Sequence, residues 1–380
     1  MSKSKGTPRK KKAPSNFIAE WYGHRLYPEV AQTDTSIRDQ QAQRCPFLTE
    51  ATGTDYQCVK VERNDGKSRG VCTISSISRR SPERQDWLAC PFRALDTAML
   101  RDAAHRLFEY DIADEITLTP APLLEKDVEI EKLRDRVAAG QPTIVYFQNN
   151  LGGEIKLSET ERSPAFSFDS TMVEVIKDSA GSLCVGKYGI FEIQTADFHG
   201  TYEQAVRNIS ENLRMYPDEF KQQIDGHRHL LAERVEGPNY SNIFKRTFYQ
   251  MILKFQVGAH DTSAGCIFAI PRAVWGSWQK HLGAPELIPA PDGTYRLSKP
   301  DVDLEESPQA WIYVFDTEVS ATQTPNKLNL WRVIGTDAPT LAYFALEVAP
   351  EALLEAGGSV DRLRDRITVK LAEYLPELRP

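Results

Sequence analysis

The chain has 380 residues, of which 41% are apolar and 26% are charged, and its formal net charge is −7 at pH 7. This composition is typical of a globular protein with one large domain or two ordinary ones. The sequence contains no run of about 18 apolar residues, which excludes a membrane-spanning helix, and its polar, basic N-terminus is unlike a signal peptide. We therefore expect a cytoplasmic protein.

The charge is unevenly distributed along the chain. Residues 1–110 carry 19 Lys and Arg against 13 Asp and Glu, whereas the remainder carries 27 against 40. A basic front and an acidic rear are compatible with a nucleic-acid-binding face, although a basic tail on an ordinary acidic enzyme explains the charge equally well. Residues 1–15 are rich in Lys and Arg and are predicted to form a disordered basic arm.

Four of the six cysteines, Cys45, Cys58, Cys72 and Cys90, lie in one polar, arginine-rich segment. Their spacing lacks a Cys-x-x-Cys pair, so scattered buried thiols explain it at least as well as a metal site does. A single ion held by four thiolates could nevertheless stabilise a segment too polar to form its own core. Disulfides are not expected in a reducing cytoplasm. We predict a recognition region over 16–110 and a separate core over 111–380.

The apolar pattern predicts an α/β protein. Helical spacing of apolar residues appears over 95–110 and 125–139, and a buried strand is predicted over 142–147. Further on, the pattern indicates a short alternating piece at 154–157, helices through 205–213 and after Asn239, strands at 265–270 and 311–315, a loop-rich stretch over 285–308, and a mostly helical end over 338–377.

Two strand-like runs deliver acidic side chains near their ends, at 163–169 and 188–194. Alternation places Asp169 opposite the neighbouring phenylalanines and puts Glu192 and Gln194 on one face. If the runs are neighbours, these three side chains converge in the arrangement that nucleases use to hold Mg²⁺ against a phosphodiester. An exposed pair of acidic strands is the alternative. His199 follows closely as a candidate proton carrier, although a lone His after a strand is more often structural.

Several stretches that occur in order along the chain carry a resemblance to a known family. They are Asn16 to Ala31, Cys45-Pro46-Phe47-Leu48-Thr49, Arg69-Gly70-Val71-Cys72, Asp86-Trp87-Leu88, Cys90-Pro91, Arg93-Ala94-Leu95-Asp96, Ser167-Phe168-Asp169, Glu192-Ile193-Gln194, Asp197-Phe198-His199-Gly200, Glu236 to Met251, and Phe268-Ala269-Ile270-Pro271. Through these stretches the sequence resembles the NotI family of type II restriction endonucleases over roughly residues 16–315.

The resemblance implies a PD-(D/E)xK nuclease core, a mixed sheet flanked by helices, preceded by a metal-binding segment in which four cysteines hold one iron or zinc ion. The implied ligands are Cys45, Cys58, Cys72 and Cys90. It also implies that Asp169, Glu192 and Gln194 are catalytic, with Glu154 as a further acid, and that Asp169 and Glu192 bind Mg²⁺. Gln194 stands where most members of the superfamily have Lys, so water activation must then depend on the metal.

The implied activity is that of a type II restriction endonuclease. It would make Mg²⁺-dependent double-strand cuts at a GC-rich palindromic site and leave 5′-phosphates. A palindromic target implies a homodimer on double-stranded DNA, and such enzymes act beside a cognate DNA methyltransferase in a prokaryotic cytoplasm. The candidate DNA-binding residues are Arg69, Arg84, Arg93, Lys245 and Arg246.

Two other functions remain open from the sequence. One is a structure-specific repair or recombination nuclease on the same core. The other is a catalytically inactive DNA-binding protein whose fold is stabilised by the bound metal. The presence of Asp169, Glu192 and Gln194 argues against the second.

Overall fold

The computed structural model describes residues 14–60, 69–77, 83–196, 198, 201–300, 302, 308–355 and 360–378, so almost all of the expected basic arm lies outside the described residues. Most of the described chain is built around a nine-stranded mixed sheet in the order β12-β13-β15-β14-β11-β10-β9-β6-β5. Its strands are β5 (Thr117–Pro120), β6 (Thr143–Gln148), β9 (Ser170–Lys177), β10 (Leu183–Ile193), β11 (Ser263–Pro271), β12 (Ile288–Pro289), β13 (Tyr295–Arg296), β14 (Ala310–Thr317) and β15 (Leu328–Thr336).

The direction of strand pairing changes from antiparallel to parallel at β10. On one side β10, β9 and β6 are antiparallel neighbours, and on the other side β10, β11 and β14 run parallel. Parallel neighbours cannot be joined by a tight turn, so the chain must cross over between β10 and β11. The crossover consists of α5 (Glu203–Met215), α6 (Phe220–Gly226), the short η3 (Arg228–Leu231) and α7 (Tyr240–Gly258).

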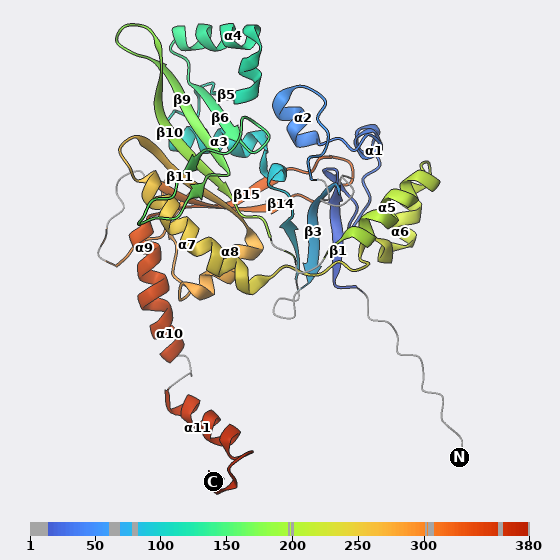
Figure 1. The fold of residues 1–380 in the computed structure, drawn as a ribbon, viewed down its shortest axis with the longest axis vertical. Helices are drawn as coiled ribbons and strands as arrows, with labels where there is room; N and C mark the ends of the chain where they lie inside the picture. The colour runs from blue at the N-terminus through green and yellow to red at the C-terminus, as the bar shows by residue number, and fades with distance from the viewer. Residues whose placement is uncertain are drawn as a thin grey trace.

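Helices cover both faces of the central strands (Figure 1). On one face, Met251 and Phe255 of α7 pack in a cluster with Ile190 of β10, and α8 (Arg272–His281) joins them. On the other face, Met99 of α3 (Thr97–Leu107) packs in a cluster with Phe191 of β10. Consecutive residues of β10 therefore point to opposite faces, as the period of a strand requires.

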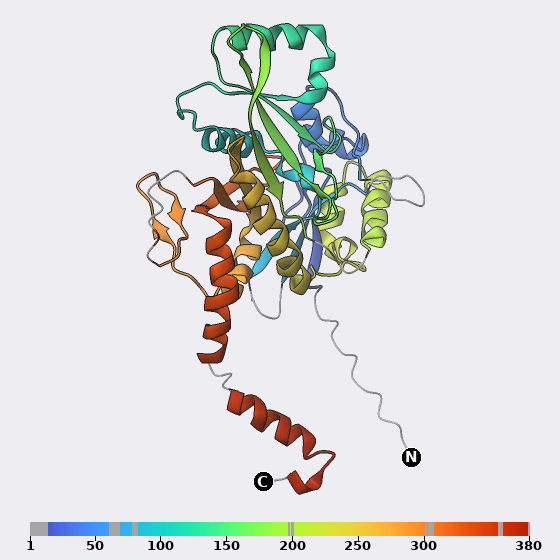
Figure 2. The same cartoon turned by 60° about the vertical axis from the view of Figure 1, so that its left-hand side comes forward.

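A further helix covers the antiparallel half of the sheet. Leu133 and Val137 of α4 (Asp127–Ala138) pack against Val145 of β6. Figure 2 shows α4, in teal, lying across the far end of the long β9–β10 pair.

The residues before α3 form a second, smaller sheet. Its order is β2-β1-β3-β4, with antiparallel neighbours throughout. Its strands are β1 (Asn16–Trp21), β2 (His24–Arg25), β3 (Val71–Ile77) and β4 (Arg84–Leu88), and the segment also contains α1 (Asp34–Gln41), α2 (Pro46–Thr52) and the 3₁₀ turn η1 (Pro91–Ala94). The sequence pattern predicted none of these strands, because β1 and β3 are buried along nearly their whole length and do not alternate.

Buried charges join the small sheet to the loop before β15. Arg93, which is 1% exposed, pairs with Glu20 of β1 through Nε and Oε2 at 2.8 Å, and donates a further hydrogen bond, 2.5 Å long, to the carbonyl of Asn326. Arg25 pairs with Asp86 at 2.6 Å and also donates to the Asn326 side chain at 2.9 Å. The Arg93 guanidinium, predicted from the sequence to contact DNA, is thus enclosed and committed to Glu20 in this arrangement.

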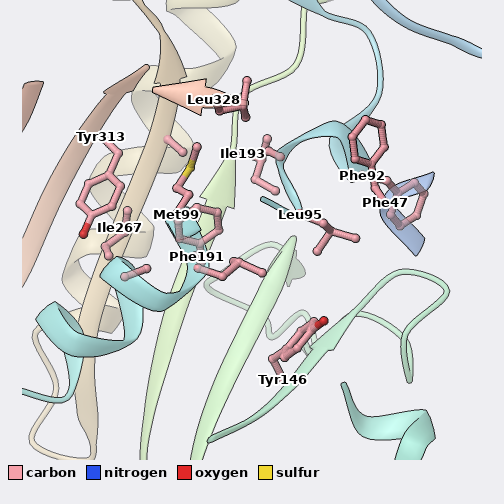
Figure 3. Packing of buried hydrophobic residues seen from close by; sticks show 14 of the residues in the cluster. Phe47, Phe92, Leu95, Met99, Tyr146, Phe191, Ile193, Ile267, Tyr313 and Leu328 are labelled. Atoms are coloured by element: carbon pink, nitrogen blue, oxygen red, sulfur yellow. The ribbon is translucent and has the colours of Figure 1, made fainter. Parts of the chain in front are cut away.

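Apolar packing continues from the small sheet into the large one. Phe47 of α2 and Phe92 of η1 belong to the same buried cluster as Leu95, Phe191 and Ile193. Figure 3 shows Phe47 and Phe92 packed together on one side of Leu95 and the sheet residues on the other. The predicted recognition region and nuclease core thus share one hydrophobic interior.

The remaining described elements lie outside the sheet centre. They are η2 (Ala121–Glu125), the short pair β7 (Lys156–Leu157) and β8 (Phe166–Ser167), and, after β15, α9 (Ala338–Tyr343), the π-helical turn η4 (Phe344–Val348), α10 (Ala349–Glu355), α11 (Val360–Leu371) and η5 (Pro376–Leu378). The expected helical end of the chain is confirmed. The run at 163–169 is only partly a strand, and the strand that pairs with β10 begins one residue later, at Ser170.

The buried pair of Arg93 and Glu20 gives a stability prediction. Replacing Arg93 by Met leaves Glu20 buried without its main cation, which should lower the free energy of unfolding by about 3–5 kcal/mol. Arg207→Met, which breaks an exposed pair with Glu203, should cost no more than about 1 kcal/mol. Urea denaturation of both variants measures the difference, and equal losses would show that the buried pair is not structural.

Candidate active site and cysteine cluster

The two predicted catalytic carboxylates lie side by side. Asp169 immediately precedes β9, and Glu192 is the penultimate residue of β10, whose Phe191 pairs with Ser170. The backbone N–H of Asp169 donates to Glu192 Oε1 at 3.0 Å, and the N–H of Ile193 donates to Asp169 Oδ2 at 3.0 Å. These reciprocal bonds fix both side chains to the neighbouring backbone, so the geometry of the pair follows from the strand register.

The pair opens into a cleft of about 370 Å³. One wall comes from β10, β11 and the residues before β9, and the other comes from α7, which contributes Tyr249, Gln250 and Lys254. Glu154 is not among the described residues that line the cleft. The next residue, Ile155, accepts a backbone hydrogen bond from Phe168 at 3.0 Å, so the chain at Glu154 runs close to the site although its carboxylate is not placed in it.

Lys254 was not identified from the sequence. Its side chain is 5% exposed, and its ammonium pairs directly with Glu192 Oε2. The ammonium also lies 5.8 Å from the centre of the Phe168 ring. The helical spacing of α7 indicates an apolar face, and a single lysine among apolar residues forms no motif that would mark it as functional.

Gln194 follows β10 and is held by its neighbours. Its Oε1 accepts a hydrogen bond from the Thr247 hydroxyl at 2.6 Å, and its Nε2 donates to the carbonyl of Thr195. Its backbone N–H continues the parallel pairing with β11 by donating to Ala269 at 2.9 Å. Both ends of the amide are therefore engaged inside the protein.

The electrostatics of the site favour a bound cation. Burial and the nearby Asp169 carboxylate raise the pKa of Glu192 to about 8, and the Lys254 ammonium opposes this rise. Two oxygen-donating carboxylates that line a cleft fit Mg²⁺, which needs only one or two carboxylates and takes its other ligands from water and phosphate. Asp169 and Glu192 would hold the ion.

The four cysteines of the small sheet are neighbours in space. Cys45 and Cys90 directly precede α2 and η1, Cys72 lies in β3, and Cys58 packs against the same cluster. Burial raises the pKa of Cys45 to about 12 and that of Cys72 well above its usual value, and the other thiols of the cluster add to both shifts.

Backbone donors surround these sulfurs, as thiolate ligands require. The N–H of Gly23 donates to Cys72 Sγ at 3.2 Å. Burial raises the pKa of Cys45 and of Cys90, and N–H groups of the turns that follow each residue offset part of this rise. All four thiols are free of disulfides. Among the described residues, however, no three His, Cys, Asp or Glu side chains form a group closed enough to hold a metal ion. The donor set fits iron or zinc in chemistry, but its side chains are not arranged around one point.

The predicted DNA-binding residues fall in different environments. Arg84 lies on β4, over the rings of Phe17 and Tyr27 at 5.0 Å each, and lines a second cavity of about 360 Å³. Arg69 lies 5.3 Å from the Tyr202 ring, beside α5. Arg246 is exposed on α7. The Lys245 side chain and His199 lie outside what the structure describes.

A scan of protein-family models and a search of curated proteins each returned no match to this sequence. Within the described part of the chain, no helix has the length and apolar character needed to cross a membrane.

The cysteine cluster gives a direct test of the metal site. If the cluster holds iron or zinc, Cys72→Ser should remove the metal, measured by elemental analysis. It should also weaken the fold around residues 45–60, 69–77 and 83–90, measured by hydrogen exchange. Cys184→Ser is the matched control, because this half-buried thiol lies on β10 outside the cluster. Wild-type protein purified without a bound metal would contradict the prediction.

The raised thiol pKa values predict how metal loading depends on pH. The raised pKa values of Cys45, Cys72 and Cys90 keep these metal-free thiols protonated near pH 7, so each bound ion must displace protons. The apparent affinity for added Zn²⁺ should therefore increase steeply between about pH 6 and pH 9. Competition titration against a chromophoric chelator measures this slope, and an affinity that does not change with pH would mean that the thiols are not the ligands.

Proposed function

We propose that this protein is a Mg²⁺-dependent DNA endonuclease of the PD-(D/E)xK type, which acts as a homodimer and cuts both strands at a specific, GC-rich site. The observation that carries the proposal is the cross-bonded pair of Asp169 and Glu192 at an open cleft. Two adjacent carboxylates fixed by strand register can supply the protein ligands that Mg²⁺ uses in phosphodiester hydrolysis.

The order of elements supports the same proposal. A helix (α4), three antiparallel strands (β6, β9 and β10), a helical crossover ending in α7, and a parallel strand (β11) follow one another around the pair. This succession agrees with the nuclease core that the sequence resemblance implies, and it places the acids at the start of β9 and the end of β10.

The chemistry would be hydrolysis of a phosphodiester. When bound, Mg²⁺ lowers the pKa of a coordinated water and offsets negative charge on phosphate. Asp169 and Glu192 hold their carboxylates in fixed positions, so no reorganisation is needed as substrate arrives. The water oxygen bonds to phosphorus in line with O3′, the P–O3′ bond breaks, and O3′ takes a proton. The products are a 5′-phosphate and a 3′-hydroxyl.

Recognition would fall to the small sheet and its surroundings. Arg69 and Arg84 are partly exposed there and can reach phosphates or guanine edges, whereas Arg93 is not available. An iron or zinc ion on Cys45, Cys58, Cys72 and Cys90 would stabilise this region. A palindromic target requires one active site for each strand, hence two copies of the chain, and a cognate methyltransferase would protect the host DNA.

Digestion of plasmid DNA tests the proposal. Asp169→Asn should abolish cleavage at every Mg²⁺ concentration while leaving site-specific binding within a few-fold of wild type, because it removes a metal ligand and no base contact. Binding is measured in Ca²⁺, whose longer and looser coordination should support binding with little cutting.

The products separate the alternatives. Discrete fragments with 5′-phosphate ends support a site-specific endonuclease. Cleavage confined to branched or damaged substrates would instead indicate a structure-specific nuclease. Binding without any cleavage would indicate an inactive DNA-binding protein.

A further inference from the structure

Helix α7 shapes the candidate active site more than the strand motif alone suggests. Thr247 holds the Gln194 amide, Tyr249 and Gln250 line the cleft, and Lys254 pairs with Glu192. The bonds of Thr247 and Lys254 join α7 to the end of β10 and the residue after it, although 53 and 62 residues separate the bonded partners in the chain. The helix therefore supplies a second set of functional groups to the cleft.

Lys254 is the only cationic residue among the described residues that line this cleft. A lysine ammonium is rarely buried, because removing it from water is costly unless it is paired and hydrogen-bonded. Here it is 5% exposed and its partner is the carboxylate proposed to bind Mg²⁺. A purely structural ion pair would need no cleft, whereas this ammonium lies where substrate phosphate would enter.

The residue at position 194 cannot supply a positive charge to the substrate phosphate. Gln194 is neutral, its amide oxygen accepts from Thr247, and its amide nitrogen donates to the Thr195 carbonyl. It is thus positioned as a structural link between β10 and α7. The positive charge that a lysine of the strand motif would provide is present in the cleft, but it comes from the helix.

We propose that Lys254 is a catalytic residue that supplies the positive charge of the active site in place of residue 194. This inference rests on the proposed nuclease function. As water attacks phosphorus, negative charge grows on the non-bridging phosphate oxygens, and the ammonium has three N–H groups with which to bind them. Lys254 exchanges no proton in this step. One proton of the attacking water passes to solvent, and O3′ takes its proton from solvent.

The test compares three variants in single-turnover cleavage of plasmid DNA. Lys254→Met should reduce the cleavage rate by about 10²–10³-fold, the usual effect of removing one donor to a developing oxyanion. Lys132→Met is the matched control, because Lys132 is also ion-paired but is 63% exposed on α4, and it should cut at the wild-type rate. The third variant carries Gln194→Lys together with Lys254→Gln, which returns the lysine to the strand, and it should recover at least tenfold of the lost rate.

Two further measurements separate catalysis from folding. Site-specific DNA binding in Ca²⁺ should be unchanged in Lys254→Met, which shows that the variant is folded. Calorimetry without DNA should show tighter Mg²⁺ binding by Lys254→Met than by wild type, because the ammonium no longer competes for Glu192 Oε2.

The outcomes are distinct. Wild-type protein that fails to cut DNA rejects the proposed function. Wild-type protein that cuts, with Lys254→Met cutting equally fast, rejects the role of Lys254 alone. A slow Lys254→Met variant whose DNA binding is also lost, with no recovery in the exchanged variant, assigns Lys254 to folding and also overturns the inference.

Discussion

The parallel pairing of β10 with β11 is the constraint on which the candidate site depends. Because these strands run in the same direction, the chain between them must travel the length of the sheet and return, and here it returns as α7. The same pairing extends past β10 through the Gln194 N–H. The end of β10 is thus fixed on one side by β11, on the other by the residues before β9, and above by α7. Glu192 lies where these three contacts meet.

This arrangement resolves an electrostatic problem. Asp169 and Glu192 are two acids held side by side, and the Asp169 carboxylate raises the cost of charging the buried Glu192. Burial and this repulsion raise the pKa of Glu192 to about 8. Lys254 offsets part of that cost in the metal-free protein. A divalent cation would offset more, so the same features that destabilise the empty pair favour cation binding.

Much of the large sheet and its helices could be predicted from the sequence, because their apolar residues follow clear periods. The predicted strand is present as β6 (Thr143–Gln148), and the two predicted helices are present as α5 (Glu203–Met215) and α7 (Tyr240–Gly258). Alternation also predicted that Asp169 and Glu192 would meet if the two runs were neighbours, and the pairing of Ser170 with Phe191 makes them so. The small sheet was not predicted, because its strands bury polar residues such as Glu20 and Thr73, which interrupt any apolar pattern and are stabilised only by distant partners. The environments of Lys254 and Arg93 could not be predicted for the same reason, since each side chain pairs with a carboxylate far away in the sequence.

Arg93 and Lys254 are both buried cations, but their surroundings suit them to different functions. Arg93 is enclosed, its partner Glu20 is enclosed, and the guanidinium is committed to one carboxylate and one carbonyl, so its contribution is to stability. Lys254 is nearly as buried, yet it lines an open cleft and its partner is a carboxylate that a cation would claim. An ion pair that can be exchanged for another ion is suited to catalysis, whereas one that cannot be reached is suited to holding the small sheet against the loop before β15. Access to the cleft, more than burial itself, therefore distinguishes the proposed active-site charge of Lys254 from the structural charge of Arg93.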